Sequence, residues 1–174
     1  MKISVCLIVR NEEENLPRAL KSIPRSYEIV IADTGSTDRT VEIAQSFGAT
    51  VIHYSWSDDF AAARNACAEE ATGDYIFALD ADEELPANTE EQIGTFVAAF
   101  PDRAGCVHLI NVTSKERSKH RMVRFYPNNR SYSFQGIVHE QVYKDGEPAR
   151  FENLPLTILH YGYEDEQYTL KNKA

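Results

Sequence analysis

Charged and polar residues follow three apolar segments directly, and the most informative of these runs is Asp80-Ala81-Asp82-Glu83-Glu84. Two carboxylates at positions i and i+2 after a buried strand repel each other in a partly desolvated place unless a cation lies near them. Mg²⁺ or Mn²⁺ is the natural cation, because it is usually held by one or two carboxylates plus substrate phosphates. The pair therefore predicts metal-assisted binding of a phosphorylated substrate, with a solvated turn as the alternative.

The apolar runs ahead of these residues are short and rich in β-branched side chains, which is typical of buried parallel strands. Segments of helical period separate them, so the pattern predicts β-α-β-α-β-α-β and a mostly parallel α/β sheet with helices on both faces. Ser36 or Thr37 is the expected N-cap of the second helix, and Gly73 is expected to close the third. The predicted strands are 3–9, 28–32, 50–53 and 75–79, and the predicted helices are 16–23, 41–47 and 60–71.

The pattern changes after residue 79. One more helix, with apolar positions from Ile93 to Phe100, precedes two segments typical of antiparallel strands. The second half is thus predicted to be a small antiparallel α+β portion that ends in a polar tail. The strands are placed at 105–112 and 120–126, the turns at 128–129 and 145–146, and the tail at 161–174.

Size and charge exclude several classes of protein. The chain has 174 residues, with 18 Lys and Arg against 27 Asp and Glu, for a net charge of −9. This length predicts one domain, and the charge disfavours binding to nucleic acid. The sequence shows no transmembrane segment and no secretory signal, so we expect a cytoplasmic protein, with peripheral attachment at the inner face of the membrane as an alternative.

Two further features are expected to be structural. Cys6, Cys67 and Cys106 lie in apolar segments without metal-site spacing, which predicts reduced core cysteines. Asn111-Val112-Thr113 matches a glycosylation sequon, but the absence of a secretory signal favours a structural role for it.

The expected site lies beyond the carboxyl ends of the parallel strands, where the three polar runs converge. The chain has neither a Gly-x-Gly-x-x-Gly motif nor a Walker-type loop, which disfavours a dinucleotide dehydrogenase and a P-loop hydrolase. Arg64, among small residues of the third helix, is the candidate for bidentate contact with phosphate. The alternative for Arg64 is a surface ion pair with Glu69 or another acid.

Four motifs, in this order, resemble glycosyltransferase family 2, whose fold is the Rossmann-like GT-A type. The second half carries two more segments that resemble the branch of this family found ahead of tetratricopeptide-type repeats, including peptide S-glycosyltransferases. The four motifs are 3–13 (ISVCLIVRNEE), 29–40 (IVIADTGSTDRT), 63–65 (ARN) and 80–83 (DADE), and the two later segments are 134–140 (FQGIVHE) and 160–163 (HYGY).

The resemblance implies an inverting, metal-dependent transfer of a sugar from a nucleotide diphosphate donor, with UDP expected, to an acceptor. It places 1–163 in one GT-A domain, with 1–85 binding the nucleotide sugar, 86–163 on the acceptor side, and 164–174 as a tail or the start of a further region. The implied donor contacts are Arg10, Asn11, Glu12, Asp33, Arg64, Asp80 and Ala81, and the implied Mn²⁺ or Mg²⁺ ligands are Asp82 and Asp80. Many members have a second Asp where Thr34 stands, which weakens the inference of uridine specificity from that position.

A sugar hydroxyl needs a base to take its proton as the new bond forms. Glu140 is the candidate, because it lies in the acceptor half beside His139 and after the flexible Gly136. The alternatives are a surface acid for Glu140 and a packed histidine for His139.

Several other residues keep two interpretations. His160 is either a nitrogen ligand of the metal or a core histidine, and Arg121 and Arg124 either face the diphosphate or an acidic acceptor or form ordinary salt bridges. His53 and Trp56 either contact an acceptor or sugar or pack in the core.

The sequence leaves the acceptor open among a saccharide, a lipid-linked molecule and a peptide, and it does not decide between a monomer and a homodimer. Two rival functions share the expected fold: a nucleotidyltransferase-like enzyme, and a non-catalytic scaffold that recruits a partner. The loop after the first strand lacks the Gly-, Arg- and Lys-rich character of a nucleotidyltransferase, and the intact Asp80 and Asp82 argue against a decayed enzyme.

Overall fold

The structure, a computed structural model, describes residues 1–112, 118–137 and 139–162. Its main feature is a curved sheet of eight strands in the order β3-β2-β1-β4-β7-β6-β11-β5, and a second sheet of three strands has the order β10-β9-β8. The strands are β1 (Ile3–Val9), β2 (Glu28–Asp33), β3 (Thr50–His53), β4 (Tyr75–Ala78), β5 (Glu83–Glu84), β6 (Ala104–Asn111), β7 (Lys119–Pro127), β8 (Tyr132–Gln135), β9 (Gln141–Lys144), β10 (Glu147–Pro148) and β11 (Phe151–His160). The helices are α1 (Leu16–Ser22), α2 (Thr40–Ser46), α3 (Phe60–Glu70) and α4 (Thr89–Ala99).

The first half confirms the predicted alternation of strands and helices. β1 pairs in parallel with β2 and with β4, and β2 pairs in parallel with β3. The second half confirms the antiparallel portion, because β7 runs antiparallel to both β4 and β6. β11 returns in parallel beside β6, and the short β5 closes that edge of the sheet.

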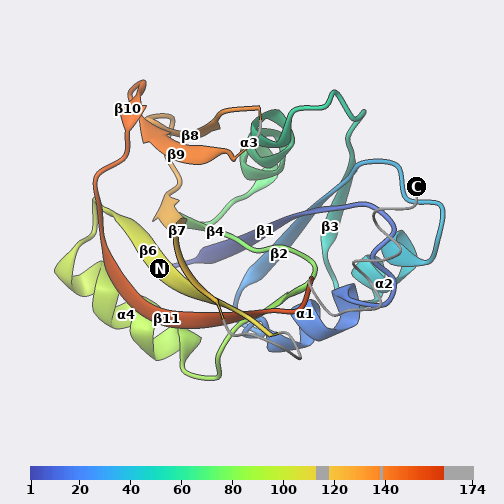
Figure 1. The fold of residues 1–174 in the computed structure, drawn as a ribbon, viewed down its shortest axis with the longest axis horizontal. Coiled ribbons are helices and arrows are strands. Elements are labelled where there is room, and N and C mark those ends of the chain that lie inside the picture. The colour runs from blue at the N-terminus through green and yellow to red at the C-terminus, as the bar shows by residue number, and fades with distance from the viewer. Residues whose placement is uncertain (113–117, 138, 163–174) are drawn as a thin grey trace.

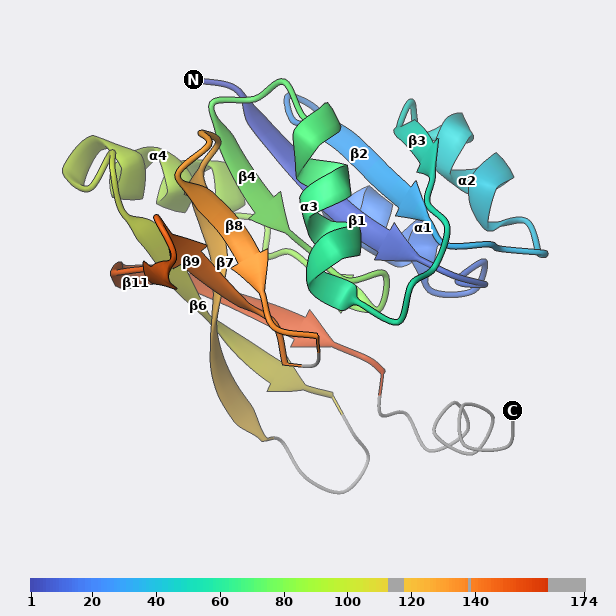
Figure 2. The same ribbon diagram turned by 90° about the horizontal axis from the view of Figure 1, so that it is seen from above.

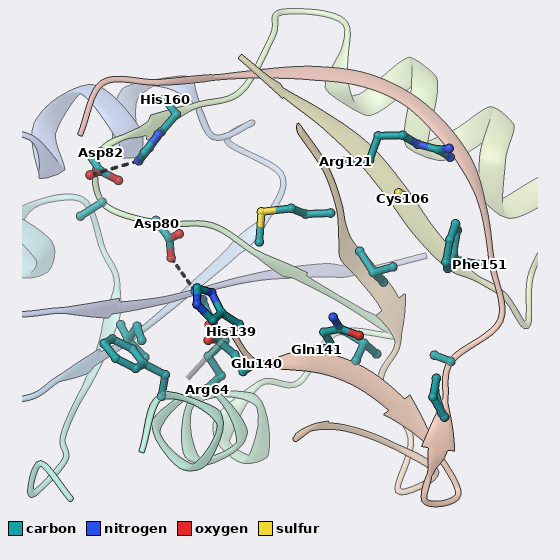
Figure 3. A pocket seen from close by; sticks show the side chains of 18 of the residues that line it. Arg64, Asp80, Asp82, Cys106, Arg121, His139, Glu140, Gln141, Phe151 and His160 are labelled. Carbon is teal, nitrogen blue, oxygen red and sulfur yellow. Dashed lines mark hydrogen bonds and ion pairs between the residues drawn. The ribbon is translucent and has the colours of Figure 1, made fainter. Parts of the chain in front are cut away.

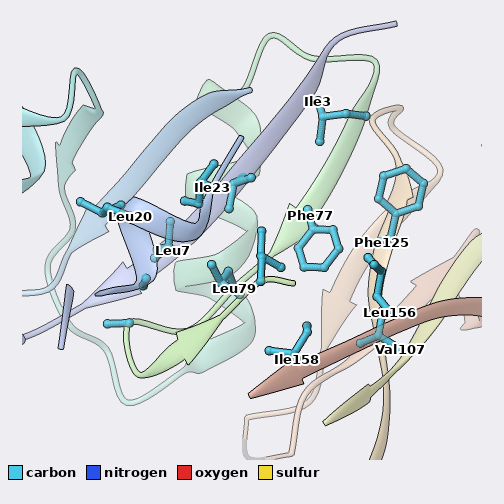
Figure 4. Packing of buried hydrophobic residues seen from close by; sticks show 14 of the residues in the cluster. Ile3, Leu7, Leu20, Ile23, Phe77, Leu79, Val107, Phe125, Leu156 and Ile158 are labelled. Atoms are coloured by element: carbon cyan, nitrogen blue, oxygen red, sulfur yellow. The ribbon is translucent and has the colours of Figure 1, made fainter. Parts of the chain in front are cut away.

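Both faces of the large sheet are covered, as predicted (Figures 1 and 2). On one face, α1, α2 and α4 pack on the larger core, where alternate residues of β1 meet Phe77, Phe125 and Ile158 (Figure 4). On the other face, α3 and the small sheet cover a second cluster that includes the buried Cys6 and Cys67. Alternation along each strand thus divides its side chains between two cores.

The cysteine prediction is confirmed, since Cys6, Cys67 and Cys106 are free and buried. The predicted tail falls mainly on 163–174, which lie outside the described residues. Within the part of the chain that the structure describes, no helix is long and apolar enough to cross a membrane.

Two predicted helix signals are wrong. The residue at the N-cap of α2 is Arg39, not Ser36 or Thr37, and the nearby acceptor is Asp38, whose Oδ1 receives the Thr40 amide at 2.9 Å. α3 ends with Ala71 as its C-cap, before Gly73. Gly73 instead lets the chain pass close to β1, because a Cβ there would lie 2.8 Å from the Ser4 nitrogen.

Glu28, the first residue of β2, ties three segments together at the amino end of the sheet. Its carboxylate accepts hydrogen bonds from the Lys2 ammonium at 3.0 Å, from the Thr72 amide at 2.7 Å and from the Ser4 hydroxyl. Burial would raise the pKa of Glu28, but the hydrogen bonds from Ser4, Thr72 and Lys2 outweigh burial and lower it to about 2. The ionised carboxylate is therefore the form that the fold favours.

We expect Glu28→Gln to reduce the free energy of unfolding by about 1–2 kcal/mol at neutral pH. Because the folded pKa lies below the unfolded one, this contribution is complete above about pH 4.5 and declines as the pH falls toward 2. Urea denaturation at several pH values measures the difference between the variants. Glu69→Gln, at an exposed position, serves as the control. If Glu28→Gln lowers the free energy of unfolding by the same amount at pH 7 and at pH 3, the Glu28 carboxylate is not the source of the pH dependence.

Candidate active site

A cavity of about 760 Å³ opens beyond the carboxyl ends of β1 and β4, where the sequence predicted the site. Figure 3 shows Asp82 and His160 at one end, Arg64, Glu140 and His139 beside α3, and Arg121 and Phe151 at the opposite end. The sequence-predicted residues that line this cavity are Glu12, Arg64, Asp80, Ala81, Asp82, Arg121, His139, Glu140 and His160. Residues far apart in the chain thus share one pocket.

Arg64 links the half of the chain predicted to bind the nucleotide sugar to the half predicted to bind the acceptor. From the small-residue face of α3, its Nη2 donates to Asp80 Oδ1 at 2.7 Å and its Nε donates to Glu140 Oε1 at 2.7 Å. The alternative was a surface ion pair with Glu69 or another acid; Arg64 does pair with two acids, Asp80 and Glu140, but its side chain is only 7% exposed, so these are not surface pairs. Its Nη1 is buried with no hydrogen-bond partner among the described residues, which leaves a donor to be satisfied by a ligand or water.

Arg124 holds the other oxygen of Asp80. Its Nη2 donates to Asp80 Oδ2 at 2.8 Å and to Glu83 Oε1 at 2.7 Å. A break in register explains its direction: Gly105 faces Phe125 whereas Cys106 faces Val123, so Arg124 is the extra residue of a β-bulge. The result is a buried charge chain, Glu140–Arg64–Asp80–Arg124–Glu83, in which the signs alternate.

The buried charge chain shifts the proton affinities of its members. Burial would raise the pKa of Asp80, but the charges of Arg124 and Arg64 outweigh burial and hold it well below its usual value. For Glu83, burial is the largest effect and raises the pKa to about 7, with Asp80 adding to the rise and Arg124 opposing it. Asp80 is thus held as a carboxylate that faces two guanidinium groups.

Asp82 and His160 form the second group of the site. β5 pairs with β11 so that Glu83 lies opposite His160, and the Tyr161 amide donates to the Asp82 carbonyl at 2.9 Å. His160 Nε2 then lies 3.4 Å from Asp82 Oδ2. Burial would lower the pKa of His160, but the hydrogen bond and the charge of Asp82, with Glu83 and Asp80, raise it.

The space beside Asp82 and His160 suits a small cation. In an octahedral site with ligands at about 2.1 Å, adjacent ligand atoms lie about 3 Å apart, close to the Asp82–His160 separation. Gly162 packs closely against this pair, because a Cβ there would collide with Asp82 Oδ2 and lie 2.8 Å from His160 Nε2. Across the described ranges, no three His, Cys, Asp or Glu side chains gather to hold a metal, so a cation beside Asp82 and His160 would need further ligands from outside this pair.

Three residues that were predicted to contact the nucleotide sugar lie at the same edge of the sheet but do not line the cavity. Arg10 is exposed, and Asn11 Oδ1 accepts the Thr37 amide at 2.8 Å, which links the loops after β1 and β2. Asp33 is 3% exposed, and its carboxylate accepts the amides of Gly35 and Ser36 at 3.2–3.3 Å. The carboxylate of Asp33 therefore orders its own loop in the free protein.

The structure also bears on the alternatives left open for Arg124, Arg121 and His53. Arg124 forms the salt bridges described above, whereas the Arg121 guanidinium lies 6.0 Å from the Phe151 ring centroid in the cavity wall. The expectation that His53 packs in the core is wrong, because its side chain is 77% exposed. The apolar wall formed by Phe151 with Met122 and Val142 was missed, since nothing local separates such residues from core positions.

Comparisons with known proteins agree with this fold. The chain is 37% identical to the TPR repeat-containing protein Synpcc7942_0270 of Synechococcus elongatus over 93% of its length and 42% of that protein. It is 30% identical to the SPbeta prophage-derived glycosyltransferase SunS of Bacillus subtilis over 99% of its length and 42% of that protein. The chain therefore spans less than half of these relatives.

A solved structure, S. aureus TarS 1-349, superposes with a TM-score of 0.61 at 17% identity, over 74% of this chain and 47% of that one. A second neighbour, glucosyl-3-phosphoglycerate synthase from Mycobacterium tuberculosis, was solved with Mn²⁺ and uridine-diphosphate-glucose. It superposes with a TM-score of 0.52 at 20% identity, over 64% of this chain and 44% of that one. Both confirm the predicted GT-A fold. The family model for glycosyl transferase family 2 matches residues 4–159, and the chain belongs to that family.

Proposed function

We propose that this chain binds a nucleotide diphosphate sugar, with UDP as the nucleotide, and transfers the sugar with inversion to a nucleophilic acceptor. One observation carries the proposal: a single pocket joins the Asp82–His160 pair to Arg64 and Glu140. The relative SunS is called a glycosyltransferase, and the mycobacterial neighbour holds Mn²⁺ and a UDP-sugar, which supports the same class of donor here. We place the transferase domain at 1–163 and leave the acceptor unassigned.

The donor occupies the end of the pocket nearest the carboxyl ends of β1 and β4 in this proposal. The buried Nη1 of Arg64 supplies an unused donor for a diphosphate oxygen, and Asp80, fixed by two arginines, faces the ribose. Glu12 lines the pocket, while the loops after β1 and β2, with Arg10, Asn11 and Asp33, enclose the nucleotide from the adjoining edge.

Asp82 and His160 would hold the divalent cation, with Mn²⁺ preferred over Mg²⁺ because an imidazole nitrogen is among the ligands. When bound, the cation stabilises the negative charge that develops on the departing diphosphate. The described chain supplies only these two donors side by side, so binding of the cation and of the diphosphate should be mutually dependent.

Glu140 is the proposed base. Its carboxylate is mostly buried, at 15% exposure, and Arg64 holds Oε1 so that the group is directed along the pocket wall. As the acceptor oxygen attacks the anomeric carbon, Glu140 takes its proton, and the bond to the diphosphate breaks with its electron pair leaving on the phosphate oxygen. His139, with a positive φ of 59°, lines the pocket beside Glu140 and bounds the acceptor position.

A panel of nucleotide sugars tests the function. We expect UDP-sugars, in the presence of Mn²⁺, to raise the melting temperature and to be hydrolysed slowly with release of UDP. A nucleotidyltransferase would instead release pyrophosphate from a nucleoside triphosphate, and a scaffold would do neither. Absence of binding to every nucleotide sugar in the panel would refute the proposal.

Asp82→Asn removes one charged ligand, so the gain in UDP affinity that Mn²⁺ provides should fall by roughly 10–100-fold. Gly162→Ala should do the same without changing any ligand, because its methyl group fills the space beside Asp82 and His160. Calorimetric titration of UDP with and without Mn²⁺ measures both. Asp145→Asn in an exposed turn and Gly94→Ala in α4 are the controls, and unchanged Mn²⁺ dependence in Asp82→Asn would disprove the metal assignment.

Glu140→Gln keeps the size of the side chain but cannot accept a proton. Transfer to a hydroxyl acceptor should fall roughly 10²-fold or more, while UDP affinity changes little. Single-turnover transfer and UDP titration separate the two effects, with the exposed Glu147→Gln as the matched control. Turnover within a few fold of the unmodified protein would exclude Glu140 as the base.

A further inference from the structure

Asn111, the last residue of β6, is buried next to the proposed metal ligand His160. Its Oδ1 lies 2.7 Å from His160 Nδ1, and its side chain is shielded from solvent. The sequence singled out this asparagine only as part of a glycosylation sequon. Burial and the contact with His160 give it a different role.

The backbone places the two residues side by side. Asn111 and His160 are register partners in the parallel pairing of β6 with β11, and the Val112 amide donates to the His160 carbonyl at 2.8 Å. The ladder therefore fixes the two backbone positions side by side, so that the two side chains start from neighbouring points.

A second contact accompanies this orientation of the Asn111 amide. Asn111 Nδ2 donates to Ser118 Oγ at 2.7 Å, and Oδ1, an acceptor only, faces the imidazole. A neutral imidazole has one N–H, and the closer acceptor is Asn111, at 2.7 Å, not Asp82, at 3.4 Å. With the proton on Nδ1, Nε2 carries the lone pair and faces Asp82, an arrangement that a cation between the two atoms would stabilise.

We propose that Asn111 is a positioning residue that holds His160 as the Nδ1–H tautomer, so that Nε2 is ready to bind the divalent cation beside Asp82. The inference rests on the proposed function for the metal. A ligand histidine usually donates its second N–H to an oxygen acceptor, and loss of that acceptor typically costs 10–100-fold in metal affinity. Without Asn111 Oδ1, the ring is free to rotate or to place its proton on Nε2, where it blocks coordination.

Three variants test the inference. Asn111→Leu removes the acceptor oxygen, and Asn111→Asp retains it. Ser118→Ala removes the hydroxyl that accepts from Asn111 Nδ2. Because Ser118 is exposed, this change should not disturb folding. Asn128→Ala is the control, since Asn128 also donates through its side chain, to the Ala71 and Gly73 carbonyls, far from the site.

The first readout needs no metal. Long-range ¹H–¹⁵N NMR at a pH where the imidazole is neutral reports the tautomer of His160, assigned by the loss of its signals in His160→Gln. We expect the Nδ1–H form in the unmodified protein and in Asn111→Asp, a mixture in Ser118→Ala, and loss of the preference in Asn111→Leu. An Nε2–H form in the unmodified protein, or a tautomer that does not respond to Asn111→Leu and Ser118→Ala, would overturn the inference.

The second readout is Mn²⁺ binding in the presence of UDP, followed by electron paramagnetic resonance. Binding should weaken 10–100-fold in Asn111→Leu, less in Ser118→Ala, and little in Asn111→Asp. Asn128→Ala should lower the melting temperature without changing either readout. If the unmodified protein binds no Mn²⁺, the proposed metal role fails while the NMR result still decides the tautomer; if it binds but the Asn111 variants bind equally well, only the inference about Asn111 fails.

Discussion

The buried charge chain from Glu140 to Glu83 is the interaction on which the rest of the site depends. It contains three carboxylates and two guanidinium groups, and Arg64 and Arg124 are almost inaccessible to solvent. Removing one member of such a set leaves an uncompensated buried charge, which costs about 3–5 kcal/mol. α3, β7, the loop after β4 and the segment around Glu140 are thereby fixed relative to one another, although they are far apart in sequence.

This constraint explains why the two aspartates after β4 have different environments. Asp80 faces back toward α3 and β7, and both its oxygens are engaged by arginines. The Asp80 amide in turn donates to Glu83 Oε2 at 2.9 Å, which shapes the turn and directs the chain into β5. Asp82 lies between Asp80 and Glu83 in the chain, and its side chain faces His160 at the end of β11. A two-residue spacing along the chain thus separates an aspartate that two arginines fix from one that faces His160.

The parallel half of the fold could be predicted from the sequence because its signals are local. Apolar β-branched runs and helical periods specify β1 to β4 and α1 to α3 within a few residues, and the rule for parallel sheets places the site at their carboxyl ends. The caps were less predictable, since Ser36 and Thr37 suit an N-cap, yet the N-cap position of α2 falls on Arg39 and Asp38 accepts the Thr40 amide. Gly73 likewise has a tertiary role that no neighbouring residue signals.

The contacts within the site depend on long-range pairing, which local patterns do not encode. The bulge that turns Arg124 toward Asp80 is visible only in the register of β6 against β7, and the Asp82–His160 pair needs β5 and β11 to meet. The sequence supplied His160 and Glu140 as candidates, but not Asn111, whose proposed role appears only when the last residues of β6 and β11 lie side by side. Residues that position others are thus the ones that motif reasoning misses.

Charge around the pocket gives a physical reason for a cation in the proposed reaction. Glu12, Asp80, Asp82 and Glu140 line the cavity against Arg64 and Arg121, within a chain whose net charge is −9. A diphosphate brings further negative charge into this partly enclosed, acidic space, where repulsion is stronger than in bulk water. Arg64 alone does not offset it, because its charge is already shared between two carboxylates. In the proposed reaction, a divalent cation beside Asp82 and His160 would reverse the sign of the local field, so the same acids that would repel an isolated diphosphate would favour its complex with the metal.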